Sequence, residues 1–128
     1  MIRHETKQRI LAIGTPMMVR RLSAKIDGEQ FAVTGCQDSE QAVALLQREE
    51  FDMVIVDNLV HNADSVCLHA STRGEAPVTL LLQEKPVDWR GLGALTVDGF
   101  LQDSGTNAEF IARLRAYIRR RPASCLTN

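Results

Sequence analysis

The residue with the clearest chemical potential follows a short apolar run. The segment FDMVIVDN, residues 51–58, places the carboxylate of Asp57 directly after four apolar residues. A continuous apolar run of this length indicates a strand that helices cover on both faces, and ligands of such sheets bind outside the carboxyl ends of the strands. Asp57 is therefore a candidate phosphate acceptor or metal ligand. The alternative is that it is only the polar end of a buried strand.

Few other residues have a spacing typical of catalytic or metal sites. Asp57, Asp103 and Glu84 follow three predicted strands and would offer oxygen ligands to a metal ion if their loops converged. Solvated carboxylates at strand ends are the simpler interpretation, because three loops must meet closely to form a site. The three cysteines form no C-x-x-C pair, which argues against a zinc site or a disulfide framework. We expect Cys36 and Cys67 to be small core residues.

Alternating apolar and amphipathic segments predict the elements that position these residues. Strands are predicted over residues 9–13, 31–35, 52–56, 77–82 and 97–101. Helices are predicted to begin at Pro16, at Asp38 or Ser39, near Asp64, at Pro86 and at Asn107. The helix after Pro86 contains two glycines, each costing about 1 kcal/mol, so we expect it to be short, irregular or mobile. Five strands alternating with five helices imply an α/β fold with a doubly wound parallel sheet.

Composition restricts the class of protein. The chain has 128 residues, of which 45% are hydrophobic, and this suits a single domain over residues 1–121 with a linker or tail over residues 122–128. A net charge of -1 gives the whole chain no electrostatic footprint for nucleic acid, and the arginines near its end are expected to be a solvated face. No signal-peptide pattern or apolar run of ~20 residues is present, so we expect a cytoplasmic protein that does not enter the membrane.

In the order and hydrophobicity of these elements, residues 7–121 resemble the receiver domains of two-component response regulators. The segment FDMVIVD is similar to the third-strand motif that ends in the phosphorylated aspartate, which places Asp57 at the acceptor position. The segment VDGFLQD is similar to the fifth strand, with Phe100 at the switch aromatic position. The segment EFIARLRAYIRRR resembles the last helix of OmpR-type regulators. This resemblance implies a flavodoxin-like (CheY-like) five-stranded sheet in the order 2-1-3-4-5.

The chain departs from the receiver pattern where a phosphoryl group would be handled. Receivers have two acids after the first strand that hold Mg²⁺ with the acceptor, and Gly14 and Thr15 stand there. The hydroxyl residue that ends the fourth strand corresponds to Leu82, and the lysine that ends the fifth corresponds to Asp103. Phosphoryl transfer requires positioning and neutralisation of charge. We therefore expect an atypical receiver with weak or absent Mg²⁺ binding, no other cofactor and no standard phosphorylation of Asp57.

The resemblance also implies partners. The chain would be the N-terminal regulatory module of an OmpR-like transcription regulator, not an enzyme, acting downstream of a histidine kinase or another signalling protein. Contact with DNA would belong to a domain absent from this chain. Regulators of this group dimerise through the fourth helix, fifth strand and fifth helix, which here would pair Asp98 with Arg113, Arg115 or Arg119. A stand-alone adaptor or ligand-sensing domain, or a receiver still phosphorylated at Asp57, are the alternatives.

Overall fold

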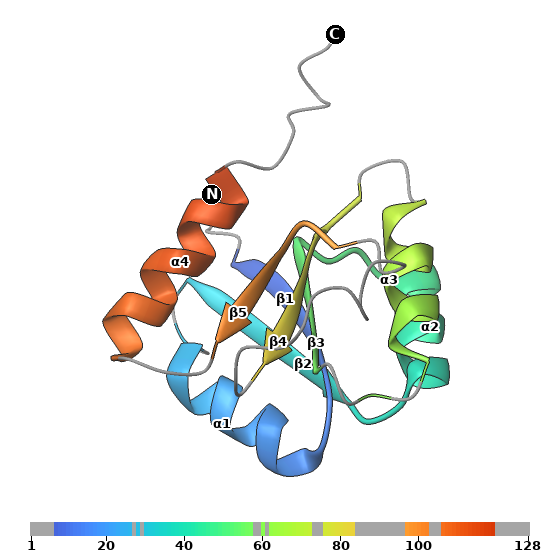
Figure 1. Ribbon diagram of the computed structural model, residues 1–128, viewed down its shortest axis with the longest axis horizontal. Helices are drawn as coiled ribbons and strands as arrows, with labels where there is room; N and C mark the ends of the chain where they lie inside the picture. Colours follow the sequence, from blue (N-terminus) through green and yellow to red (C-terminus); the bar gives the residue numbers. More distant parts are fainter. Residues whose placement is uncertain are drawn as a thin grey trace, which may run out of the picture.

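Five parallel strands form the centre of the molecule (Figure 1). The computed structural model describes residues 7–26, 28, 30–57, 60, 62–72, 76–83, 97–102 and 106–119, with only the backbone of residues 64 and 83. The strands are β1 (Gln8–Ile13), β2 (Phe31–Cys36), β3 (Met53–Asp57), β4 (Val78–Gln83) and β5 (Gly99–Gln102). Their order is β2-β1-β3-β4-β5, which confirms the predicted sheet, and each strand end lies within two residues of its predicted position.

Four helices connect or follow these strands. They are α1 (Pro16–Ile26), α2 (Ser39–Arg48), α3 (Ala63–Ser71) and α4 (Asn107–Arg119). Helix α4 is the fifth of the predicted helices, because the one predicted after Pro86 lies outside the described residues. None of the four is long and apolar enough to cross a membrane.

Side-chain caps begin two of the helices where the sequence predicts them. Asp38 precedes α2 and its carboxylate accepts a hydrogen bond of 2.8 Å from the backbone N–H of Gln41. Thr106 precedes α4, and its hydroxyl accepts from the N–H of Glu109 at 3.1 Å while the Glu109 carboxylate accepts from the N–H of Thr106 at 3.0 Å. This reciprocal pair is a capping box, which satisfies two backbone donors at the start of the helix.

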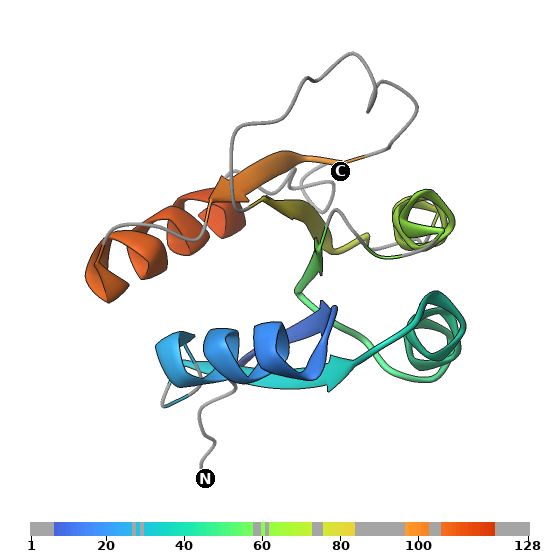
Figure 2. The same ribbon diagram turned by 60° about the horizontal axis from the view of Figure 1, so that its bottom comes forward.

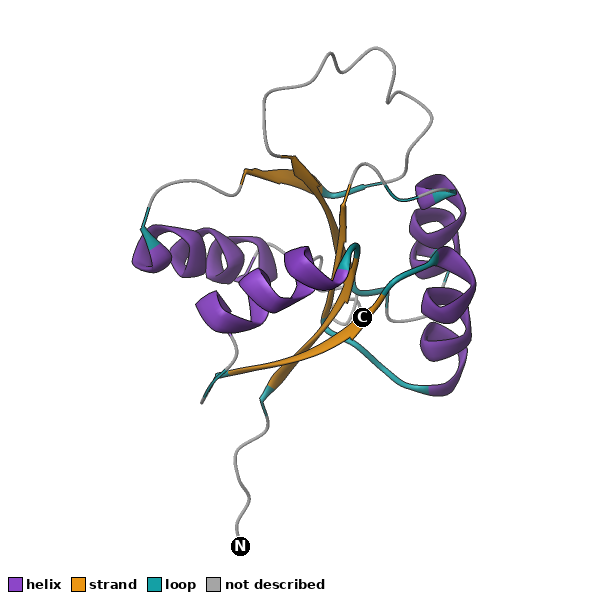
Figure 3. Ribbon diagram, turned by 90° about the horizontal axis from the view of Figure 1, so that it is seen from below, coloured by secondary structure: helices purple, strands orange, loops and turns teal. Residues whose placement is uncertain are grey.

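Helices α1 and α4 cover one face of the sheet, and α2 and α3 cover the other (Figures 2 and 3). Successive strand residues point to opposite faces, so Ile10 and Ala12 join the core beneath α1 and α4, while Leu11 and Ile13 join the core beneath α2 and α3. All four side chains are fully buried. The central strands therefore need apolar residues at every position, as the sequence of residues 53–56 predicted.

The two cysteines in the described part of the chain are core residues, as expected. Cys36 and Cys67 are free thiols buried in the core beneath α2 and α3. Burial raises the pKa of the Cys36 thiol from 9.0 to about 11, and the nearby charge of Asp38 adds to the rise. At neutral pH this thiol stays protonated and is a poor nucleophile.

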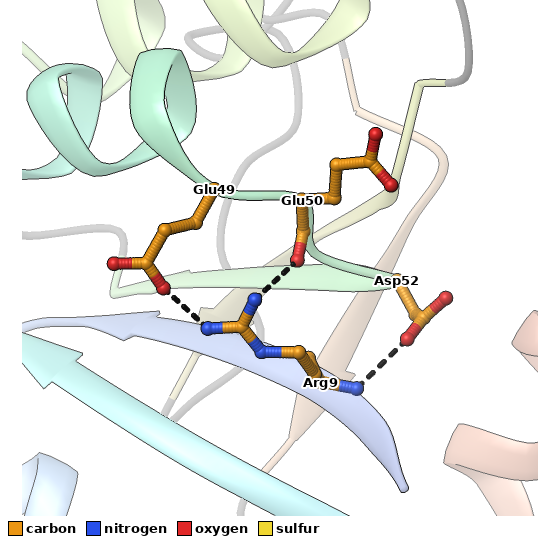
Figure 4. A network of polar contacts seen from close by, with 4 residues as sticks. All are labelled: Arg9, Glu49, Glu50 and Asp52. Atoms are coloured by element: carbon orange, nitrogen blue, oxygen red, sulfur yellow. Dashed lines mark hydrogen bonds and ion pairs between the residues drawn. The ribbon is translucent and has the colours of Figure 1, made fainter. Parts of the chain in front are cut away.

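A polar network joins β1 to the chain segment that enters β3 (Figure 4). The N–H of Asp52 donates to the carbonyl of Arg9 at 2.8 Å, and the N–H of Arg9 donates to Oδ2 of Asp52 at 2.8 Å. The Arg9 guanidinium donates to the carbonyl of Glu50 at 3.0 Å, pairs with the carboxylate of Glu49 and lies 4.7 Å from the centroid of the Phe51 ring. These contacts fix the start of β3 against β1 at the edge opposite the candidate site.

Candidate functional site

The strand register brings three of the predicted site residues together. Val56 pairs with Ile13 of β1, so the next residues, Asp57 and Gly14, lie beside each other at the carboxyl ends of their strands. A Cβ atom placed on Gly14 would lie 3.2 Å from Cβ of Asp57. On its other side Asp57 pairs with Leu82 at the end of β4. The half-buried carboxylate of Asp57 therefore stands between a glycine and a leucine.

The side chain of Met18 fills the space directly beside Gly14, and the sequence analysis did not identify Met18 as a site residue. The same Cβ position on Gly14 would lie 2.9 Å from both Sδ and Cε of Met18, whose side chain is buried. Helix α1 begins here with Thr15, whose hydroxyl accepts a hydrogen bond of 3.1 Å from the backbone N–H of Met18. A thioether thus fills the place next to Asp57, and the Thr15 hydroxyl caps the helix.

The described residues do not fit Mg²⁺ in the manner that the receiver pattern requires. Mg²⁺ binds one or two carboxylates with phosphate and water oxygens in near-octahedral geometry. Of the three positions that supply such ligands in receivers, Gly14 and Thr15 have no carboxylate, and only Asp57 does. No group of three or more histidine, cysteine or acidic side chains within the described ranges could hold a metal ion. Asp103 and Glu84 lie outside those ranges.

Two curated sequences resemble the chain over most of its length, and no protein-family model matches it. One is a "probable transcriptional regulator ycf27" of Porphyridium aerugineum, 26% identical over 118 residues, which are 89% of this chain and 49% of the relative. The other has the same description in Guillardia theta and is 28% identical over 120 residues, 91% of this chain and 47% of the relative. The chain therefore spans about half the length of these relatives.

Two solved structures with the same arrangement are receiver domains. The signal receiver domain of an HD domain-containing protein from Pseudomonas fluorescens Pf-5 has a TM-score of 0.80 and 16% identity, covering 99% of this chain and 98% of that one. The receiver domain of the sensor histidine kinase PA1611 from Pseudomonas aeruginosa, which has magnesium in its active-site cleft, has a TM-score of 0.75 and 20% identity, covering 89% and 99%. This chain has the receiver-domain fold.

Leu82 is the residue that the resemblance placed where receivers have a hydroxyl that bonds the phosphoryl group. Its side chain is buried and packs in the core beneath α1 and α4. Because a leucine side chain has no hydrogen-bond donor, it offers nothing to a phosphoryl oxygen. Strand β4 therefore places an apolar side chain directly beside Asp57.

Phe100, which the resemblance placed at the switch aromatic position, is half-buried against the core beneath α2 and α3. Its carbonyl accepts a hydrogen bond of 3.3 Å from the hydroxyl of Tyr117 on α4. The Tyr117 ring lies over Gly99, because a Cβ there would be 2.5 Å from the hydroxyl oxygen and 2.6 Å from Cζ. Tyr117 thus links α4 to β5. The signal for this contact in the sequence is Gly99, because a glycine inside a strand often marks the close approach of another group.

Asp98 stabilises the start of β5 within its own chain. Its backbone N–H donates to the carbonyl of Thr79 at 2.7 Å, and its Oδ2 accepts from the N–H of Thr79 at 2.7 Å. This repeats, between β4 and β5, the pairing that Asp52 makes with Arg9 between β3 and β1. The residue that the resemblance assigned to an interface therefore also fixes β5 to β4, although it remains exposed.

The three arginines predicted at the same interface lie on different sides of α4. Arg115 donates from Nε to Oε1 of Gln30 at 3.0 Å, so it is directed toward the residue that precedes β2. Arg119, four residues later, lies on the same side of the helix as Arg115. Arg113 is four residues before Tyr117 and therefore lies on the side that contacts β5.

Proposed function

We propose that this chain is a receiver-type signalling domain that forms the regulatory half of a transcription regulator. The receiver-domain fold, the two regulator relatives and the half-length match support this proposal. In it, residues 1–121 are the domain, residues 122–128 begin a linker, and a histidine kinase or another signalling protein acts upstream. DNA recognition belongs to a domain outside these 128 residues, and this domain catalyses no reaction of its own.

In this proposal the domain signals without Mg²⁺-dependent phosphorylation of Asp57. The observation that carries it is the packing beside Asp57, where the Met18 thioether lies against Gly14 and Leu82 of β4 pairs with Asp57. A phosphoryl group on Asp57 would add negative charge where the two residues that flank it, Gly14 and Leu82, supply neither a metal ligand nor a hydrogen-bond donor side chain. Receivers neutralise that charge with a metal ion and a lysine, and the lysine position here is Asp103.

An NMR titration with Mg²⁺ and then beryllofluoride, which mimics an aspartyl phosphate, tests this mode of signalling. We expect no saturable shift at the backbone amides of Gly14, Asp57 and Leu82. A Gly14→Asp/Met18→Ala variant restores a carboxylate and the space for it, so it should gain a weak Mg²⁺ response and show that the assay detects binding. Saturable shifts in the natural chain that vanish in Asp57→Asn would instead establish a receiver that is still phosphorylated.

We also propose that two copies associate through the face formed by β5 and α4. Asp98 is exposed at the start of β5, and Arg113 lies on the β5 side of α4. Exposed ion pairs contribute only ~0 to 1 kcal/mol, so such pairs would orient the two copies more than they stabilise the dimer. The interactions of Arg115 with Gln30 place that arginine on the other side of the helix.

Sedimentation velocity of single variants tests this interface. Asp98→Asn removes the charge but keeps an oxygen that can accept from the Thr79 N–H, whereas alanine would also loosen β5. We expect Asp98→Asn and Arg113→Gln each to weaken association by about two- to fivefold. Arg115→Gln is the matched control and should leave association unchanged. Equal effects of Arg113→Gln and Arg115→Gln, or no effect of Asp98→Asn, would show that this face is not the interface.

A further inference from the structure

The methionines in the described part of the chain differ greatly in exposure. Met17 is 68% exposed, Met18 is 4% exposed and Met53 is fully buried. Met17 and Met18 are neighbours in the first turn of α1, whereas Met53 begins β3. Oxidants convert the methionine thioether to a sulfoxide, which is polar and disrupts apolar packing. The three residues are therefore a graded series of oxidation sites within one chain.

Met18 is the member of this series that the structure places in the candidate site. A Cβ atom on Gly14 would lie 2.9 Å from both Sδ and Cε of Met18 and 3.2 Å from Cβ of Asp57. The thioether and the Asp57 side chain therefore border the same small space. Met18 also belongs to the core beneath α1 and α4. Its side chain thus closes that core at the end nearest to Asp57.

The backbone of α1 is held close to the sheet at this point. The side chain of Val19 lies so near Gly35 of β2 that a Cβ there would collide with it. Thr15 holds the first turn, because its hydroxyl accepts from the N–H of Met18 at 3.1 Å and its carbonyl accepts from the N–H of Val19 at 3.0 Å. A change at Met18 is therefore accommodated more readily by its own side chain, which has three rotatable bonds, than by movement of the helix.

A sulfoxide at Met18 would be unfavourable where the thioether now lies. Its oxygen carries a partial negative charge and would lie near Asp57 or among the apolar residues of the core. The N–H of Gly14 already donates to the carbonyl of Cys36 at 3.1 Å. Burial of a polar group without a hydrogen bond costs free energy. Rotation of the oxidised side chain toward solvent removes that cost and empties the space between Gly14 and Asp57.

We propose that Met18 is a site of oxidation by hydrogen peroxide and that its sulfoxide opens the space beside Asp57. A lone pair of Sδ attacks one peroxide oxygen, and the O–O bond breaks as the S–O bond forms. The proton of the transferred oxygen passes to the departing hydroxide, which leaves as water, so sulfur loses two electrons and the peroxide is reduced. The oxidant reaches Sδ through local openings of the first turn of α1, where Thr15, Pro16 and Met17 are exposed.

This proposal rests on the proposed function, because it gives an input to a receiver-type domain that does not use Mg²⁺-dependent phosphorylation. The modification is reversible, since methionine sulfoxide reductases restore the thioether. The reduced and oxidised chains would differ at the strand ends around Asp57, which is the residue at the acceptor position. An oxidant would then change the same part of the domain that phosphorylation changes in receivers.

Stepwise treatment of the full 128-residue chain with hydrogen peroxide, followed by peptide mass spectrometry, tests the order of oxidation. A thiol reductant is added after each step, because it reverses disulfides and sulfenic acids of the cysteines but leaves methionine sulfoxide in place. The exposed fractions predict that Met18 reacts on the order of tenfold more slowly than Met17. Met53 should remain a thioether until Met18 is fully oxidised.

NMR spectra of the same samples test the opening. We expect the backbone amides of Gly14 and Asp57 to shift as Met18 is oxidised, and to return after treatment with a methionine sulfoxide reductase. Met18→Leu keeps an apolar side chain of similar volume but has no sulfur, so these amides should not respond to peroxide. Met17→Leu is the matched control, because it removes the exposed neighbour and should keep the full response.

Four results would overturn the proposal. Oxidation of Met18 no faster than that of Met53 would mean that the folded chain protects it. Unchanged amides of Gly14 and Asp57 in the chain with Met18 sulfoxide would mean that the space stays closed. The same shifts in Met18→Leu would assign the response to another group, and loss of the dispersed spectrum would mean that oxidation unfolds the chain. The titration of the unoxidised chain with Mg²⁺ and beryllofluoride is independent of all four, so failure of this proposal can be told apart from failure of the proposed signalling mode.

Discussion

Replacing Gly99 with alanine should lower the free energy of unfolding by about 2 kcal/mol, as overpacking of a well-filled contact does. The new methyl group would lie 2.5 Å from the hydroxyl oxygen and 2.6 Å from Cζ of Tyr117. The ring cannot turn away freely, because its hydroxyl donates to the carbonyl of Phe100. Helix α4 must therefore shift from β5 or the hydrogen bond must break. Urea unfolding followed by circular dichroism measures the loss.

Two variants separate this clash from the general effect of replacing glycine. Gly28→Ala is the matched control, because a Cβ there would meet no heavy atom within 4 Å. It should be neutral or stabilise the chain by about 0.4 to 1 kcal/mol through the unfolded state. Gly99→Ala combined with Tyr117→Leu should cost less than the sum of the two single changes, because leucine lacks the clashing atoms. If Gly99→Ala is as harmless as Gly28→Ala, the close packing of Tyr117 on β5 is wrong.

The sheet was predictable from the sequence because its signals are local. Residues 53–56 are apolar at every position, which predicted a strand covered on both faces, and all four side chains are fully buried. Asp38 was predicted as a possible helix cap and is one. The predicted strand ended at residue 56, whereas β3 includes Asp57, because the pairing of Asp57 with Leu82 extends the ladder by one residue.

The contacts that define the site were not predictable, because they join residues from different elements. A glycine inside a strand signals close approach of another group, but the sequence does not say which group. Only the fold shows that Gly99 meets Tyr117, and the packing of α1 on the sheet places Met18 against Gly14. The sequence alone identified the missing carboxylate at Gly14, and the structure identified the thioether that fills the space.

Two residue roles that the resemblance to receivers implied also changed, because contacts between different elements decide them. Asp98 was expected only as an interface acid, yet its carboxylate accepts from the backbone N–H of Thr79. Arg115 was one of three arginines expected as possible partners of Asp98 across a dimer, and within its own chain it bonds Gln30. Position in a helix and hydrogen bonds to the backbone decide such roles, and a linear pattern records neither.

Replacing Phe110 with alanine should have the largest effect of the changes considered, about 3 to 5 kcal/mol of unfolding free energy. Phe110 is fully buried and packs in the core beneath α1 and α4. Its removal leaves a cavity between the two helices and also deletes the contact with Lys25, which contributes about 0.5 to 1 kcal/mol. Because a domain of this size has only about 5 to 15 kcal/mol of stability, such a loss should lower its thermal midpoint sharply.

Phe100→Ala and Phe110→Leu are the controls for this change. Phe100 is only half-buried, so Phe100→Ala should lower the free energy of unfolding by less than Phe110→Ala does. If Phe100→Ala nevertheless has the larger effect on signalling, that effect would come from the position of Phe100 on β5. Phe110→Leu keeps an apolar side chain of similar reach and should cost less than about 1.5 kcal/mol. Equal losses in Phe110→Ala and Phe100→Ala would mean that α4 is not anchored by this ring. The β5–α4 face would then lack the rigid helix on which the proposed interface depends.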